Sequence, residues 1–202
     1  DHRDLHRLIR RQRQMCIRDS SLTAYDFSAD YLREAAKRAR KMKVNLRTVR
    51  GDMRKLKFKN EFSAVINLFT SFGYFTKISE DLKVLNGINK ALKKGGLLLM
   101  DLLNADFVLK SFHPKNWLFT EKKWLLEERK LFRDGIISTW ILISKRGQAR
   151  KKTFFIRLYN RAKLGLMLKK AGFRPLRFWG DFRGSHLSPR SNRLIVLAQK
   201  IK

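Results

Sequence analysis

Short apolar runs alternate with helix-length amphipathic segments between residues 22 and 101, and this alternation constrains the fold more than any other feature. The strand-like runs are residues 22–25, 46–49, 62–69 and 97–100. Two segments between them have helical periodicity: Ser28 can cap a helix that extends to about residue 42, and Ser79 opens a second that ends at Gly95 and Gly96. Strands and helices in alternation predict an α/β fold with a parallel sheet.

The pattern changes after Asn104. A short helix at about residues 105–112 precedes three strand-like runs, at residues 124–132, 136–144 and 151–159. Turn signals at Asp134-Gly135 and Arg146-Gly147 separate these runs, as expected for antiparallel strands joined by hairpins. We therefore expect a three-stranded antiparallel insert, followed by a helix at residues 164–171 and strands at residues 176–179 and 194–198.

These patterns divide the chain into four parts. The predicted parts are residues 1–20, a basic segment that does not match the rest of the chain; residues 21–104, an α/β core; residues 105–160, the insert; and residues 161–202, the end of the core. Residues 15–20 resemble translated sequencing-adapter DNA, so we interpret the first segment as a replaced N-terminus. A genuine basic helix or arm is the alternative.

The chain is strongly basic, with 47 Lys and Arg against 17 Asp and Glu and a net charge of +30. Such a charge attracts polyanions, so a nucleic acid is one candidate partner. Because the charge is spread along the chain, solvated surface side chains explain it equally well. The single cysteine, Cys16, fits a reducing compartment, and no apolar run reaches membrane-spanning length. We expect a cytoplasmic protein that has no membrane partner, and its oligomeric state stays open.

Polar residues follow three of the predicted strands: Asp26, Asp52 and Asn67. Ligands of doubly wound sheets bind beyond the carboxyl ends of the strands, where an acidic side chain can accept hydrogen bonds from ribose hydroxyls. Three such residues in order predict a ligand site at this edge of the sheet.

The sequences around these residues resemble a known family. Tyr25-Asp26-Phe27-Ser28, then Gly51-Asp52-Met53-Arg54, then residues 65–74 are similar to successive motifs of class I S-adenosylmethionine-dependent methyltransferases. Residues 92–101 resemble the family's junction of helix, glycines and fifth strand. The resemblance covers roughly residues 20–202 and implies a Rossmann-like methyltransferase sheet with S-adenosylmethionine as the cofactor.

The resemblance implies roles for individual residues on the cofactor. Asp26 would bind the ribose, with Phe27 against the adenine. Asp52 would contact the adenine amino group, beside the backbone of Met53.

Further roles concern the methionine end of the cofactor and the acceptor. Asn67 and Phe69 would line the methionine end, and Tyr74 would face the methyl acceptor. Arg157 and Tyr159, at the end of the insert, are candidates for the acceptor pocket. The sequence indicates neither a catalytic acid or base nor a metal site, since His2, His6, His113 and His186 lack ligand spacing.

The sequence departs from the family at one important motif. The family begins with a strand and a G-x-G loop whose backbone amides approach the cofactor, but none of the 11 glycines here forms a G-x-G. We therefore expect the first strand and the following helix to be lacking, and this chain to bind S-adenosylmethionine poorly or not at all and to be inactive as written.

The acceptor stays open at this point. A small molecule or a protein is favoured, since the insert resembles the substrate-covering lid of that branch of the family. An RNA methyltransferase is the first alternative, although residues 67–70 do not match the N-P-P-Y motif of enzymes that methylate base amino groups. A basic nucleic-acid-binding domain without enzymatic activity is the second.

Overall fold

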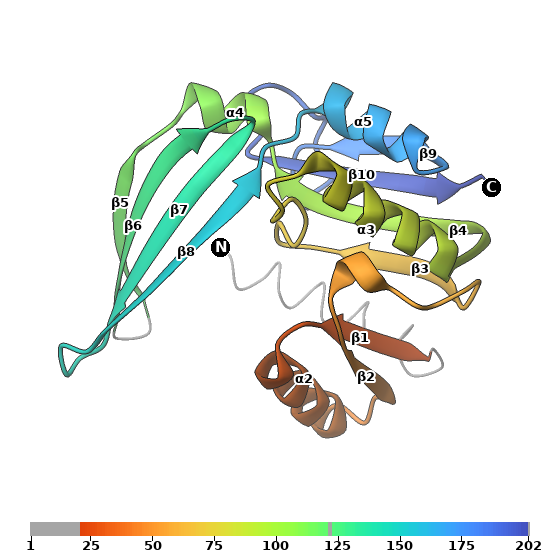
Figure 1. Cartoon of the computed structure of the whole chain (residues 1–202), viewed down its shortest axis with the longest axis horizontal. Helices are drawn as coiled ribbons and strands as arrows, with labels where there is room; N and C mark the ends of the chain where they lie inside the picture. The colour runs from red at the N-terminus through yellow and green to blue at the C-terminus, as the bar shows by residue number, and fades with distance from the viewer. Residues whose placement is uncertain (1–20, 121–122, 202) are drawn as a thin grey trace. The chain divides into compact units, whose positions relative to one another are not determined.

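A computed structural model describes residues 21–120 and 123–201 (Figure 1). The chain forms two compact units, divided between Leu56 and Lys57. The segment 1–20, on which the interpretation of a replaced N-terminus rests, lies outside the described residues.

The first unit is a strand–helix–strand motif. Strand β1 (Leu22–Asp26) leads into helix α2 (Ala29–Lys41), which returns to β2 (Leu46–Arg50). The Oγ of Ser28 accepts a hydrogen bond from the backbone N–H of Tyr31, so the predicted cap of α2 is confirmed. The two strands are parallel and in register, and a 3-10 turn, η1 (Met53–Lys55), follows β2.

The sheet of the second unit has the strand order β3–β4–β10–β9. Its strands are β3 (Phe62–Asn67), β4 (Leu92–Leu103), β10 (Arg193–Lys200) and β9 (Phe173–Trp179). β3 and β4 are parallel, whereas β10 is antiparallel to both of its neighbours. The expectation of a parallel sheet is therefore correct for the early strands and wrong for β10. The connection to β10 from the neighbouring β9 contains no crossover helix, and so the last strand reverses.

Helices α3 (Ile78–Ala91) and α5 (Arg161–Lys170) run along the strands of this sheet (Figure 1). Their buried apolar residues include Val84, Leu85 and Ile88 of α3 and Leu164 and Leu168 of α5. α3 ends at Ala91 rather than at the glycine pair, because β4 already begins at Leu92 and Gly95 lies within that strand. Within the described residues no helix is both long enough and apolar enough to cross a membrane.

The insert is a four-stranded antiparallel sheet rather than the expected three-stranded one (Figure 1). Helix α4 (Ala105–Lys110) leads into β5 (Lys115–Thr120), β6 (Lys123–Phe132), β7 (Gly135–Ile143) and β8 (Ala149–Arg157). The sequence prediction missed β5, which is short and pairs with β6 from Lys115 to Thr120. The insert joins the core through Ile136 and Leu158, which pack with Ala105 and Val108 of α4.

Candidate functional site

The end of β1 presents Asp26 and Phe27 to solvent. Asp26 Oδ1 accepts a hydrogen bond of 2.7 Å from the backbone N–H of Ser28, which fixes the carboxylate at the strand end. The Phe27 side chain is 71% exposed, and the Arg50 guanidinium lies 5.8 Å from its ring centroid. Arg50 Nε also donates to the carbonyl oxygen of Phe27. An exposed aromatic ring held beside a carboxylate can stack on a flat ligand.

Asp52 follows β2 and is tied to Arg54. Its Oδ1 accepts from the backbone N–H of Arg54, and its Oδ2 lies 2.6 Å from Nη2 of the same residue. The hydrogen bond from the Arg54 side chain, more than any other contact, lowers the pKa of the Asp52 carboxyl below its ordinary value. Met53 begins the 3-10 turn that Asp52 caps. Asp52 is thus an ionised carboxylate whose partner already occupies part of its hydrogen-bonding capacity.

Gly51 is required by the side chain of Tyr25. The Tyr25 hydroxyl donates to the backbone oxygen of Asp52 at 2.9 Å, so its ring passes directly over Gly51. A Cβ at residue 51 would lie 2.1 Å from the Tyr25 hydroxyl oxygen, which is too close for any side chain. Packing against Tyr25 therefore explains the glycine at residue 51, independently of any ligand.

In the second unit, Asn67 ends β3 with an unsatisfied acceptor. Its Nδ2 donates weakly to the Ser71 carbonyl at 3.4 Å, whereas its Oδ1 is buried and accepts no hydrogen bond from any described residue. A buried acceptor without a donor is costly unless a ligand or water supplies one. Asn67 Oδ1 therefore fits a ligand with an N–H or O–H donor.

The turn after Asn67 is strained. Phe69 and Thr70 both adopt φ of 57°, in the left-handed region that β-branched residues such as threonine disfavour. Asp101 holds the turn, since its Oδ2 accepts from the Phe69 backbone N–H and its backbone oxygen accepts from that of Thr70. Arg193 pairs with the fully buried Asp101 at 2.6 Å. Backbone strain held by a buried ion pair is typical of functional sites.

The sequence did not indicate a site role for Asp101 or Arg193. A charged residue within the apolar run of residues 97–103 was the available signal for Asp101. Arg193, 92 residues further along the chain, gave no local signal.

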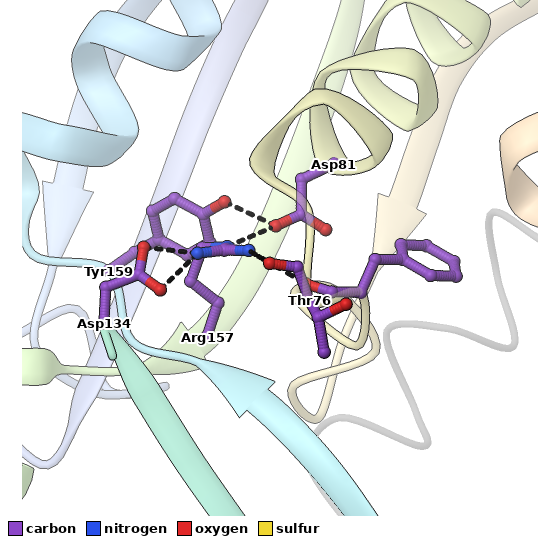
Figure 2. A network of polar contacts seen from close by, with 6 residues as sticks. Thr76, Asp81, Asp134, Arg157 and Tyr159 are labelled. Carbon is purple, nitrogen blue, oxygen red and sulfur yellow. Dashed lines mark hydrogen bonds and ion pairs between the residues drawn. The ribbon is translucent and has the colours of Figure 1, made fainter. Parts of the chain in front are cut away.

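Arg157 and Tyr159 lie inside a buried polar network (Figure 2). Arg157 Nε donates to Asp81 Oδ2 at 2.9 Å, its Nη1 contacts Asp134, and the Tyr159 hydroxyl donates to Asp81 at 2.8 Å. Arg157 and Tyr159 are 5% and 1% exposed. Burial raises the pKa of both the Asp81 carboxyl and the Tyr159 hydroxyl. The two acceptor-pocket candidates thus have side chains that are already engaged.

The same network fixes the loop that carries Tyr74. Arg157 Nη2 donates to the carbonyl oxygens of Phe75 and Thr76, and its backbone N–H donates to that of Gly73 at 2.7 Å. Tyr74 itself is 42% exposed, and its ring centroid lies 6.3 Å from that of Phe154 in β8. Tyr74 therefore stays accessible to a ligand.

Comparisons with known proteins agree with this architecture. Residues 7–96 match a family model described as a methyltransferase domain. A S-adenosylmethionine-dependent methyltransferase from Clostridium acetobutylicum ATCC 824 superposes with a TM-score of 0.81 at 16% identity, over 90% of this chain and 75% of that one. The chain therefore has the fold of a S-adenosylmethionine-dependent methyltransferase, and its residues 7–96 are similar to a methyltransferase domain. No curated protein matches its sequence.

Two further structures have the same methyltransferase fold. The CcbJ methyltransferase from Streptomyces caelestis has a TM-score of 0.76 at 18% identity, over 89% of this chain and 74% of that one. CalS10 from Micromonospora echinaspora, described as a SAM-bound amino pentose methyltransferase, has a TM-score of 0.60 at 16% identity, over 94% and 87%. S-adenosylmethionine, the cofactor that the sequence resemblance implies, is bound in the CalS10 structure.

Proposed function

We propose that the intact protein transfers the methyl group of S-adenosylmethionine to a small-molecule acceptor. The observation that carries this proposal is the architecture of the second unit, a mixed sheet with an antiparallel β10 and with the polar Asn67 at the carboxyl end of β3. Ligands bind at this edge of such sheets. The unsatisfied Asn67 Oδ1 supports the proposal, because the cofactor's amino group is a donor that would satisfy it.

Each unit contributes its own candidate contacts. In the first, Asp26 would accept from the ribose hydroxyls, Phe27 would lie against the adenine, and Asp52 with the Met53 backbone would contact the adenine edge. In the second, Asn67 and Phe69 would line the methionine end. All these residues would bind and orient the cofactor.

The chemistry requires little more than positioning. The bound cofactor supplies an electrophilic methyl group on a sulfonium, whose positive charge is neutralised when the acceptor displaces it in line. Orientation of the two reactants can therefore account for most of the acceleration. The chain's part is to hold the acceptor's nucleophilic atom in line and exclude water.

A small molecule is the acceptor class that we favour. CalS10 is described as acting on an amino pentose, and this chain carries an antiparallel insert beside the loop of Tyr74. RNA is the competing class, and the charge of +30 is the observation in its favour. Residues 67–70 lack the motif of enzymes that methylate base amino groups, which favours the small molecule.

We further propose that the first strand and glycine-rich loop of the intact protein precede residue 21 and are not part of this sequence. The absence of any G-x-G among its 11 glycines supports this. Without that loop we expect weak cofactor binding.

Calorimetric titration with S-adenosylhomocysteine tests both parts. We expect no micromolar binding to the 202-residue chain, and micromolar binding once the genomic sequence upstream of residue 21 is restored. In the restored protein D26N should weaken binding roughly tenfold, whereas D30N on helix α2 should not. Micromolar binding by the present chain would disprove the second part, and no binding by the restored protein would disprove the first.

A further inference from the structure

The insert sheet has two distinct faces, one of which carries a mixed aromatic and polar surface. Side chains alternate between the faces of a strand, and directly paired residues share a face. Arg129 lies opposite Ser138, which lies opposite Phe154, and the neighbouring row is Glu127, Trp140 and Lys152. We call this surface the Phe154 face; it is defined by Glu127, Arg129, Trp140, Lys152 and Phe154.

The Phe154 face borders the loop that follows β3. The Tyr74 ring lies 6.3 Å from Phe154, and the backbone of Gly73 is hydrogen-bonded to the edge of β8 through Arg157. The loop begins at the carboxyl end of β3, where ligands of such sheets bind. A molecule resting on the Phe154 face would therefore lie beside the cofactor end of the sheet.

Trp140 provides an oriented aromatic surface on this face. Its ring packs edge-on against Phe154, with centroids 5.0 Å apart and an interplanar angle of 89°. Its Nε1 donates to Glu127 Oε1 at 2.9 Å, which fixes the plane of the indole. The side chain is still 41% exposed. A fixed, half-exposed indole can stack on a ring with little loss of side-chain entropy.

The charge that stays available on this face is positive. Glu127 uses one oxygen for Trp140, and its other oxygen lies 3.4 Å from Arg129 Nε. That buried Nε forms no hydrogen bond to any described residue. Lys152 is exposed and has no ion pair among residues 21–120 and 123–201. An anion bound at Arg129 would accept the hydrogen bond that Arg129 Nε does not donate to Glu127.

We propose that the Phe154 face binds an acceptor that carries a ring and a carboxylate or phosphate group. The ring lies on Trp140, and the anionic group pairs with Arg129 beside Lys152. This proposal rests on the proposed function only in identifying the ligand as the methyl acceptor, because binding to the Phe154 face requires no cofactor. The alternative occupant, a cationic amine held by the aromatic rings, is an outcome of the test.

Ligand-observed NMR titration of the full chain with three probes decides between the anionic and the cationic ligand. The probes are phenyl phosphate, benzoate and benzylamine, with inorganic phosphate added to measure the contribution of the ring. We expect phenyl phosphate or benzoate to bind, benzylamine not to bind, and inorganic phosphate to bind at least about fivefold more weakly than phenyl phosphate. Tighter binding of benzylamine, or no binding of either anionic probe, overturns the proposal.

The neighbouring residues of β5 and β6 provide matched control variants. R129Q should weaken binding of the anionic probe by about tenfold or more, whereas K130Q, with the same charge change on the opposite face, should leave it unchanged. R129K keeps the charge and should fall between them, and it serves if R129Q does not fold. W140A should weaken binding and W117A, on the opposite face, should not. Equal effects of R129Q and K130Q would reduce the binding to general charge and overturn the assignment.

These results are separable from those on the cofactor. Binding of phenyl phosphate to this face in a chain that never binds S-adenosylhomocysteine would keep the site and remove the methyltransferase role. If the restored protein binds S-adenosylhomocysteine but R129Q and W140A do not change binding of the probes, the methyltransferase role is kept and the site on the Phe154 face is removed.

Discussion

Arg157 and Asp81 form a buried ion pair that joins the insert to the core, with 2.9 Å between Nε and Oδ2. Arg157 ends β8 and Asp81 lies in the first turn of α3, so the pair links two elements that are 76 residues apart. The Arg157 guanidinium also binds Asp134 and two loop carbonyls. One side chain thus fixes the insert, the helix and the loop that carries Tyr74.

Loss of this side chain should destabilise the fold strongly. R157M removes the partner of Asp81 and leaves its carboxylate buried with an unpaired charge, for which we expect a loss of about 3–5 kcal/mol in the free energy of unfolding. R150M, in the exposed part of the same strand, should change it by less than about 0.5 kcal/mol. Urea unfolding measures both variants. Equal midpoints for R157M and R150M would show that the buried pair does not stabilise the protein.

Two glycines should respond to alanine with opposite signs. Gly73 has φ of 95°, and a Cβ at this residue would lie 3.1 Å from the Arg157 carbonyl oxygen, so G73A should destabilise by roughly 1–3 kcal/mol. Gly165 lies inside α5 with open space around it, so G165A should stabilise by about 0.5–1 kcal/mol. Thermal unfolding gives both shifts. A destabilised G165A would mean that the exposed side of α5 is covered.

The elements with clear local periodicity could be predicted from the sequence. β1, α2 and β2 lie within a residue or two of their expected positions, because apolar spacing and the Ser28 cap are local signals. β3 ends two residues earlier than expected, at Asn67, since Phe69 and Thr70 turn into the left-handed region. Asp101, which holds that turn, lies in another strand, so periodicity could not reveal it.

The fourth strand of the insert and the buried network could not be predicted for a related reason. β5 has six residues and follows Pro114, and pairing with β6, rather than its own pattern, makes it a strand. Asp81, Asp134 and Arg157 are far apart in the sequence, and each is an ordinary surface residue by local criteria. Their burial depends on tertiary packing between distant segments, which no local stretch of the sequence reveals.

The Asp52–Arg54 pair should make stability depend on acid pH. Because the pKa of Asp52 is lowered in the folded chain, its carboxylate stabilises the fold above the unfolded value near 3.8. This stabilisation is lost as the pH falls through the lower, folded pKa. D52N should therefore cost roughly 1 kcal/mol at pH 7 and less at pH 2. R54M removes the same ion pair and should give a similar profile in urea unfolding. A D52N effect that is equal at both pH values would contradict this.

The net charge of +30 should produce binding to polyanions without recognition of sequence. If the basic residues act only through charge, single-stranded RNA and DNA of equal length should bind with equal affinity and the same steep salt dependence. Fluorescence anisotropy between 50 and 200 mM salt measures both the affinities and their salt dependence. Over this range counterion release changes the affinity by about a thousandfold or more when several phosphates are contacted. R129Q and K130Q each remove one positive charge and should weaken both interactions equally. A preference of about tenfold or more for RNA, or a selective loss in one variant, would favour RNA as the acceptor over the small molecule.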